Sequence, residues 1–215
     1  MKIVVVGSGG REHAIALQLA RSPRVSQVIS APGNPGMARL GACWPALTPS
    51  NFAEFVQRCR DESVAHVVIG PEAPLVDGLA DLLRAAGIPC FGPNSQGAML
   101  EGSKAFAKDF MQRHGIPTAR SSTLDREDQI DAALADLPER VVVKASGLAA
   151  GKGVILCDDH QQAAEVTRGM LQGALFGESG RTVVIEEMME GPEVSILAVV
   201  NGMDALLLPP AQDHK

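Results

Sequence analysis

The chain has 215 residues, 46% of them hydrophobic, which suffices for the packed cores of one or two domains. A formal net charge of -6 and only 3% aromatic residues argue against a nucleic-acid partner, because neither a basic surface nor stacking rings are expected. The first apolar run stops at Gly7, and no run approaches the roughly 20 residues of a membrane span, so we expect a cytoplasmic protein without a membrane partner.

The cysteines support this location. They are widely spaced and form no pair typical of a metal site, so we interpret them as reduced, packed residues. They are Cys43, Cys59, Cys90 and Cys157. His13 and His66 are likewise interpreted as structural residues.

The first hundred residues alternate short apolar strands with helical patterns. Strands are predicted at residues 2–6, 25–30 and 64–69, and helices at 11–21, 51–61 and 75–86. This alternation predicts an α/β fold with a doubly wound parallel sheet. Such sheets bind ligands at the carboxyl ends of their strands. The loops expected there are 7–13, 31–36 and 70–74.

The first of these loops contains three glycines, in the sequence Gly7-Ser-Gly-Gly-Arg-Glu-His13. The dinucleotide fingerprint requires glycine where this chain has Glu12, and no acid follows the next strand at Ala31, so NAD binding is not expected. Glycine amides at a helix N-terminus still favour a phosphate group. A tight strand-to-helix turn without a ligand is the alternative.

The pattern changes after about residue 101. Helices are predicted at residues 103–114, 124–137 and 159–172, and strands at 140–145, 153–157 and 181–187. A hairpin of strands 193–200 and 203–208 is predicted to turn at Asn201-Gly202.

Lys144 leads directly from an apolar strand into a glycine-rich loop at residues 147–153. The loop is not a Walker P-loop, because its glycines are too close, Gly153 stands where the magnesium-binding hydroxyl would be, and a strand follows. As a hairpin tip it can close its amides over phosphates beside a lysine, although a merely flexible hairpin would have the same pattern. Glu186, Glu187 and Glu193 then form either an acidic nucleotide contact or an ordinary charged strand end.

Six segments, taken together, resemble the phosphoribosylamine–glycine ligase family of the ATP-grasp enzymes. They are Gly7–His13, Ala31–Gly36, Gly70–Leu75, Leu100–Lys104, Lys144–Val154 and Gln212–Lys215, in the order and spacing of that family. The resemblance implies a Rossmann-like, pre-ATP-grasp domain at residues 1–102. An ATP-grasp domain at 103–215 would follow, with its lid at about 122–188 and the start of a second subdomain.

The resemblance also implies an activity. ATP would activate glycine as glycyl phosphate, and the amine of 5-phosphoribosylamine would attack it to give glycinamide ribonucleotide, ADP and phosphate. The partners would be these small molecules only, and the protein would be a monomer. A magnesium or manganese ion would take part, with ligands downstream of this chain and none within it.

Site residues are carried over by motif. ATP would contact Lys104, Lys144, Gly147, Gly151, Lys152, Gly153, Glu186, Glu187, Met188, Met189 and Glu193. The sugar phosphate would contact Gly9, Gly10, Arg11, Asn34 and Glu72. Residues with a catalytic role would be Lys144, Asp213, His214 and Lys215.

The chain differs from the family pattern in two ways that bear on these assignments. Ser146 stands where the family commonly has Asp, and the family is about twice this length, so we expect the chain to be a fragment that is inactive alone. The alternatives are another ATP-grasp ligase, including a biotin-carboxylase-like enzyme, and a nucleotide-binding module without turnover.

Overall fold

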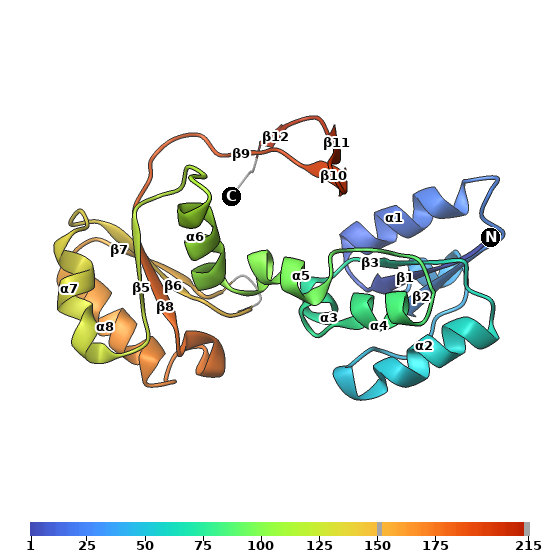
Figure 1. The fold of residues 1–215 in the computed structure, drawn as a ribbon, viewed down its shortest axis with the longest axis horizontal. Coiled ribbons are helices and arrows are strands. Elements are labelled where there is room, and N and C mark those ends of the chain that lie inside the picture. The colour runs from blue at the N-terminus through green and yellow to red at the C-terminus, as the bar shows by residue number, and fades with distance from the viewer. Residues whose placement is uncertain (150–151, 213–215) are drawn as a thin grey trace.

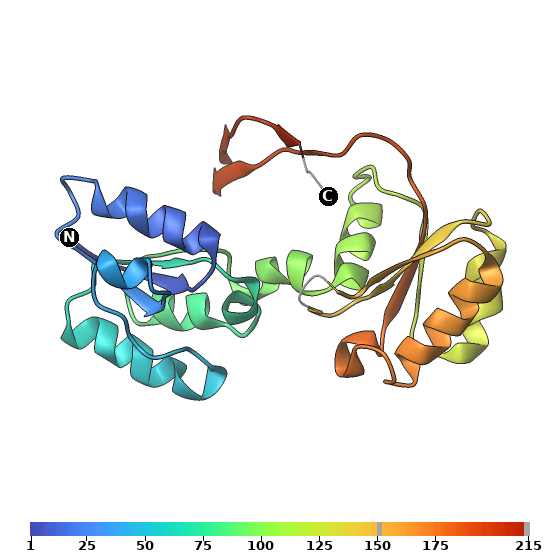
Figure 2. The ribbon, with the colours of Figure 1, turned by 180° about the vertical axis from the view of Figure 1, so that it is seen from behind.

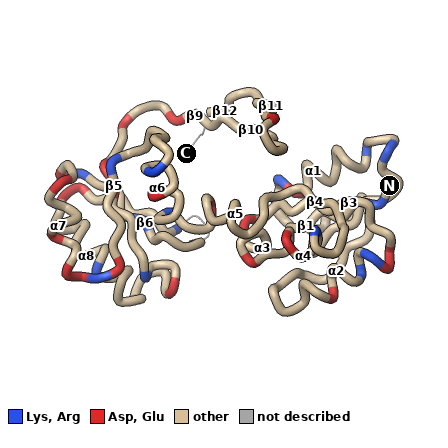
Figure 3. Tube along the Cα trace, viewed as in Figure 1, with Lys and Arg blue, Asp and Glu red and all other residues tan. Residues whose placement is uncertain are grey.

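The computed structural model describes residues 1–149 and 152–212, in which two α/β units are followed by a segment of short paired strands (Figure 1). Within these residues, we find no helix with the length and apolar character needed to span a bilayer. Seen from behind, α5 (Ser95–Gly102) lies between the two units (Figure 2). Acidic and basic residues are interspersed along the described trace (Figure 3).

The N-terminal unit is built on a four-stranded sheet. Its strands run parallel in the order β2-β1-β3-β4. They are β1 (Lys2–Gly7), β2 (Gln27–Pro32), β3 (His66–Ile69) and β4 (Cys90–Phe91). Because β1 lies between β2 and β3, the carboxyl ends of β1 and β3 adjoin at the point where the strand order reverses.

Helices cover both faces of this sheet. Val4 and Val6 of β1 belong to the apolar cluster that includes residues of α2 (Phe52–Asp61) and α4 (Leu79–Ala85). The intervening Val5 packs with Ala16 of α1 (Gly10–Ala20). Alternate side chains of one strand are therefore buried on opposite faces, and the predicted doubly wound α/β sheet is confirmed.

The helix predicted at residues 75–86 is present but interrupted, so the prediction of one continuous helix was wrong. The structure has α3 (Glu72–Val76) and α4, separated by Asp77 and Gly78. Gly78 has φ +86°, a left-handed conformation that ends the first helix and begins the second. Glu72 accordingly begins a helix instead of lying within a loop. The sequence reasoning also missed β4 and α5.

The second unit is built on an antiparallel sheet, here called the lid sheet. Its strand order is β5-β8-β6-β7. The strands are β5 (Ser121–Leu124), β6 (Val141–Ala145), β7 (Val154–Cys157) and β8 (Val183–Glu187). Residues of α7 (Ile130–Ala135) and α8 (His160–Leu171) pack in the apolar cluster on one face. α6 (Lys104–Arg113) contacts β8 through the opposite face, where Lys108 meets Glu186.

The predicted helix at 124–137 was too long, because Leu124 ends β5 and the helical part begins after Asp125. Short 3-10 helices complete the described elements. They are Met37–Arg39, Pro49–Asn51, Glu127–Gln129 and Gly177–Gly180.

The last segment forms two short antiparallel pairs. β10 (Ala198–Asn201) pairs with β11 (Asp204–Leu207), and β9 (Val194–Ser195) pairs with β12 (Ala211–Gln212). Asn201 is opposite Asp204, so the turn is Gly202-Met203, one residue later than predicted. The predicted strand 193–200 is divided because β9 pairs with β12 instead of continuing into the hairpin.

Candidate functional site

The glycine-rich segment connects β6 to β7 as a hairpin, as predicted. Val154 is opposite Lys144, and the Ala145 amide donates to the Gly153 carbonyl at 2.8 Å. A Cβ at Gly153 would lie 2.8 Å from the Cβ of Ala149, so this close return of the chain requires glycine. Lys152 is exposed. Gly151 lies outside the described residues.

The start of this loop is held by Ser179. The Ser179 hydroxyl donates to the Leu148 carbonyl at 2.7 Å, and the Gly147 amide donates to the Ser179 carbonyl at 3.1 Å. A Cβ on Gly147 would lie 3.0 Å from the Cα of Ser179. The short helix Gly177–Gly180 therefore fixes the position from which the loop leaves the sheet.

A cluster of three charged groups lies on the face of the lid sheet that α6 covers. Glu186 is buried, with one carboxylate oxygen 2.5 Å from the Lys108 ammonium and the other in contact with the Lys144 ammonium. Lys108 also donates to the Thr118 hydroxyl at 2.8 Å and to the Ala119 carbonyl at 3.1 Å. Burial lowers the pKa of Lys108, and the nearby Glu187 carboxylate opposes that shift. The cluster carries two positive charges and one negative charge.

Glu187 has a different partner. Its carboxylate accepts hydrogen bonds from the Arg120 amide and from the Arg120 guanidinium, both at 2.8 Å. The hydrogen bond from the Arg120 amide and, next in importance, that from the Arg120 guanidinium hold the pKa of Glu187 below its usual value. The two adjacent glutamates therefore differ in role, since Glu186 faces the lysines and Glu187 ties β8 to the start of β5.

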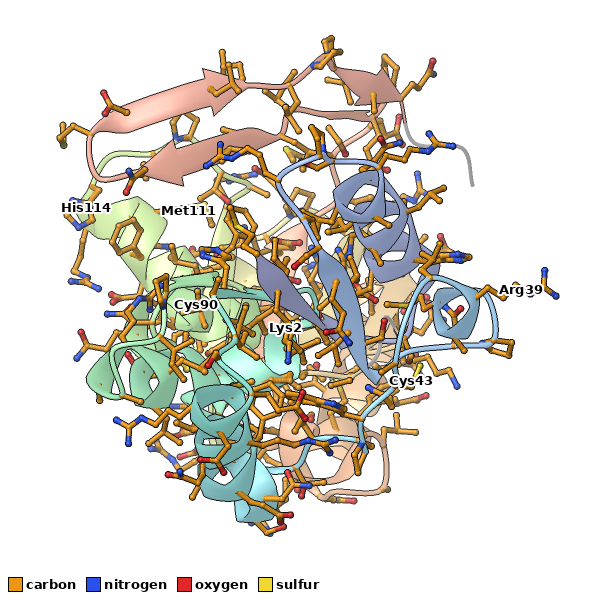
Figure 4. The ribbon with its side chains drawn as sticks, turned by 90° about the vertical axis from the view of Figure 1, so that its right-hand side faces the viewer. Lys2, Arg39, Cys43, Cys90, Met111 and His114 are labelled. Atoms are coloured by element: carbon orange, nitrogen blue, oxygen red, sulfur yellow. The ribbon has the colours of Figure 1, made fainter. Side chains whose placement is uncertain are left out.

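A cavity of about 480 Å³ opens beside the cluster. Of the predicted ATP contacts, Lys144, Glu186, Glu187 and Met189 line it. The other lining residues come from α6, the segment before β5, and β6. They are Lys108, Met111, Pro117, Thr118, Ala119 and Val142. Figure 4 labels Met111 on α6, the helix that carries Lys108, and His114 directly after the end of that helix.

The other predicted ATP contacts, apart from Gly151, are described but do not line this cavity. Lys104 is half-buried as the first residue of α6, Met188 is half-buried, and Glu193 is exposed beyond β8. Sequence reasoning missed Lys108. Its only signal was the four-residue spacing from Lys104, which places both lysines on one face of a helix.

Ser146 joins the loop to α6. Its hydroxyl accepts from the Ala105 amide at 3.0 Å and lies 3.1 Å from the Ser103 hydroxyl, and its carbonyl accepts from the Lys104 amide at 2.9 Å. Ser146, which replaces the Asp expected from the family resemblance, thus accepts hydrogen bonds from backbone amides at a helix N-terminus. A carboxylate oxygen can accept the same bonds.

The predicted sugar-phosphate residues separate into groups. Arg11 and Glu72 line a second cavity, of about 420 Å³, together with Gly70, Leu75 and residues of α5. Gly9 lines a neighbouring cavity of about 210 Å³ with Glu12. Gly10 and Asn34 line neither of these two cavities. The Asn34 side chain donates to the Ser8 carbonyl and accepts from the amides of Gly36 and Met37, so it shapes the loop after β2.

Glu12 explains the departure from the dinucleotide fingerprint. Its buried carboxylate accepts from the Gly9 amide at 2.8 Å. A Cβ at Gly7 or at Gly70 would lie within 2.5 Å of the Glu12 side chain, which therefore fills the space between the ends of β1 and β3. The amide expected to attract a phosphate is already bonded to an internal carboxylate.

Two family models cover the chain. The phosphoribosylglycinamide synthetase N domain matches residues 1–101, and the phosphoribosylglycinamide synthetase ATP-grasp (A) domain matches residues 102–215. The chain belongs to the phosphoribosylglycinamide synthetase family. This confirms the resemblance and sets aside the other ATP-grasp families as alternatives.

Relatives of this synthetase family cover the whole chain. A phosphoribosylamine–glycine ligase of Allochromatium vinosum is 51% identical over 100% of this chain and 50% of its own length. The trifunctional purine biosynthetic protein adenosine-3 of Gallus gallus is 48% identical over 100% of this chain and 22% of its own length. The chain thus spans about half the length of the bacterial ligase.

Solved structures agree on the fold. The phosphoribosylamine–glycine ligase of Thermotoga maritima matches 98% of this chain and 49% of its own, with a TM-score of 0.81 and 32% identity. An ADP complex of N5-carboxyaminoimidazole ribonucleotide synthetase shares the fold with a TM-score of 0.79 at 17% identity, over 100% of this chain and 54% of its own.

The described residues of this family member offer no cluster typical of a metal site. Among residues 1–149 and 152–212, no group of three or more His, Cys, Asp or Glu side chains could hold a metal ion. The described residues do not fit the divalent ion that the family resemblance implies. Asp213, His214 and Lys215, predicted to act in catalysis, lie outside the described residues.

Proposed function

We propose that this chain supplies the ATP-binding lid and the sugar-phosphate-binding domain of an enzyme that ligates glycine to 5-phosphoribosylamine. Residues 1–102 and 103–215 are the two proposed domains. The observation that carries the proposal is the cavity in which Lys144, at the start of the glycine-rich loop, meets Glu186 beside Met189.

The cavity suits a nucleotide in both charge and shape. Lys144 and Lys108 supply positive charge where phosphates would lie. Val142 and Met189 supply apolar surface for a base. Leu156 is opposite Val142 on the same face of the lid sheet and is 59% exposed, so it extends that surface towards the edge strand.

The glycine-rich loop adds backbone donors and a cover. Its two ends are held by hydrogen bonds, since the Gly147 amide donates to the Ser179 carbonyl and the Gly153 carbonyl accepts from the Ala145 amide. Phosphoryl transfer to the glycine carboxylate depends mainly on positioning and charge neutralisation. The resulting acyl phosphate is protected from hydrolysis when a lid excludes water.

The second cavity suits the other substrate. Arg11 at the beginning of α1 can pair with a phosphate, and Glu72 at the beginning of α3 can accept from ribose hydroxyls or from an amine. Both residues follow strands at the reversal point of the sheet, the usual ligand position in this architecture. No step is assigned to a metal ion, because the described residues do not form a site for one.

The proposal includes a cytoplasmic location and action as a monomer. All four cysteines are free thiols in the structure, which agrees with a reducing compartment.

Ligand protection against limited proteolysis tests the proposal. We expect ATP to protect the segment around residues 146–153 and 5-phosphoribosylamine to protect the N-terminal domain. Lys144→Met should abolish the ATP effect. Lys2→Met is the control, because Lys2 and its partner Glu62 both lie in the N-terminal domain, away from the proposed ATP site. This variant should retain the protection by ATP. Protection by ATP but not by 5-phosphoribosylamine would instead favour a nucleotide-binding module without this activity.

A further inference from the structure

Lys108 is the buried cation of the 480 Å³ cavity, where the proposed function gives it the same task as Lys144, a supply of positive charge. It is 8% exposed, and its ammonium has three acceptors, on Glu186, Thr118 and Ala119. An ammonium group has three hydrogens, so these acceptors satisfy it in its present position. The Thr118 and Ala119 oxygens belong to the segment just before β5, which fixes Lys108 from outside the lid sheet.

Lys144 reaches the same carboxylate from the other side. Lys108 contacts Oε2 of Glu186, and Lys144 contacts Oε1. The side chain of Lys144 is 28% exposed, against 10% for Lys108, so Lys144 is the more exposed lysine of the cluster. The two lysines therefore differ in solvent exposure, although they share one partner.

We propose that Lys108 is a positioning residue for ATP: it remains paired with Glu186 and so allows the Lys144 ammonium to exchange its contact with Glu186 for one with an ATP phosphate. This inference rests on the proposed function, because it assumes that ATP occupies the cavity.

The reason is the cost of an unpaired buried charge. If Glu186 had Lys144 as its sole cation, movement of Lys144 towards a phosphate would leave a buried carboxylate uncompensated, which is strongly unfavourable. With Lys108 in place, Glu186 keeps a charged partner in both arrangements. Direct binding of Lys108 to a phosphate is a poorer solution, because it would break contacts with Glu186, Thr118 and Ala119 together.

ATP titration of the 215-residue chain tests the role. Lys108→Gln removes the charge but retains N–H donors for Thr118 and Ala119, so it is the variant most compatible with folding. We expect it to weaken ATP binding on the order of tenfold. Lys108→Arg keeps the charge and should restore much of the affinity. An unchanged dissociation constant in Lys108→Gln would overturn the proposal.

A double-mutant cycle separates positioning from direct contact. In a Glu186→Gln background the shared carboxylate of residue 186 is gone, so Lys108→Gln should then change the ATP dissociation constant by less than about twofold. A tenfold loss that persists in this background would show that Lys108 binds ATP directly and would refute the positioning role.

Acetylation of Lys144 by acetic anhydride, followed by mass spectrometry, gives a readout without ATP. Lys108→Gln should slow acetylation of Lys144, because Glu186 then pairs with Lys144 alone, while the exposed Lys152 should react at the wild-type rate. An unchanged or faster acetylation of Lys144 would contradict the proposal that both lysines share the Glu186 carboxylate.

Failure of the wild-type chain to bind ATP would refute the proposed function itself, whereas wild-type binding that is insensitive to Lys108→Gln refutes only the role of Lys108.

Discussion

The hydroxyl of Ser146 accepts a hydrogen bond from the Ala105 amide at 3.0 Å, across 41 residues of sequence. Ala105 is in the first turn of α6, whose N-cap is Ser103. Two serines from distant segments therefore satisfy amides of the same helix N-terminus. The end of β6, where the glycine-rich loop begins, is thereby attached to the helix that carries Lys108.

This contact predicts the effect of substitutions at residue 146. Ser146→Ala should lower the free energy of unfolding by about 1 kcal/mol, because a partly buried amide at a helix N-terminus loses its acceptor. Ser146→Asp should retain at least wild-type stability, since a carboxylate accepts the same bond and interacts favourably with the helix dipole. Urea denaturation of the three proteins measures both effects. Equal stability of Ser146→Ala and wild type would show that the contact contributes nothing.

The pairing of Arg120 with Glu187 predicts a pH dependence of stability. Because the pKa of Glu187 is lowered on folding, its contribution is present above the pKa of the unfolded chain and is lost as the pH falls through the folded value. Arg120→Met should therefore lower the thermal unfolding midpoint at pH 7 and have a smaller effect near pH 3. An Arg126→Met control, at an exposed pair with Asp128, should show a weaker dependence. A difference between wild type and Arg120→Met that stays constant with pH would contradict the assignment.

The fold could largely be predicted from the sequence because its strongest signals are local. Apolar runs such as that before Gly7 predicted strands of the N-terminal sheet, and their alternation with helices predicted that these strands run parallel. β4 was missed because two residues, Cys90 and Phe91, present no periodic pattern. β5 was missed because its Ser121, Ser122 and Thr123 contain no apolar run, and it is a strand through pairing with β8.

The candidate site was only partly predictable for a different reason. Lys144 and Glu186 could be found because each occurs in a motif along the chain. Lys108 acquires its role from oxygens on Thr118, Ala119 and Glu186, which only the packing of α6 on the lid sheet brings together. The bond between the Glu12 carboxylate and the Gly9 amide has a signal in the sequence, the capping-box spacing from residue 9 to residue 12, which the prediction of a phosphate site overlooked.

For the substitution Gly78→Ala, the sequence-based helix and the structure predict opposite changes in the free energy of unfolding. If residues 75–86 formed one helix, Gly78→Ala would stabilise it by about 1 kcal/mol through helix propensity. In the structure Gly78 has φ +86°, so an alanine would be strained and should destabilise the protein by roughly 1 kcal/mol or more. Ala85→Gly, within α4, is the matched control and should destabilise by helix propensity alone. Increased stability of Gly78→Ala would restore the single-helix interpretation.

The contact between Ser179 and Leu148 predicts how the glycine-rich loop is controlled. Ser179→Ala removes the hydroxyl that binds the Leu148 carbonyl, so amide hydrogen exchange should become faster in residues 147–149 while exchange in α8 stays unchanged. Gly147→Ala should have a larger effect, because its Cβ would lie 3.0 Å from the Cα of Ser179 and would force the two segments apart. If the loop is positioned for ATP by this contact, both variants should also bind ATP more weakly, with Gly147→Ala the weaker of the two. Faster exchange without any change in ATP affinity would show that Ser179 orders the loop but has no part in nucleotide binding.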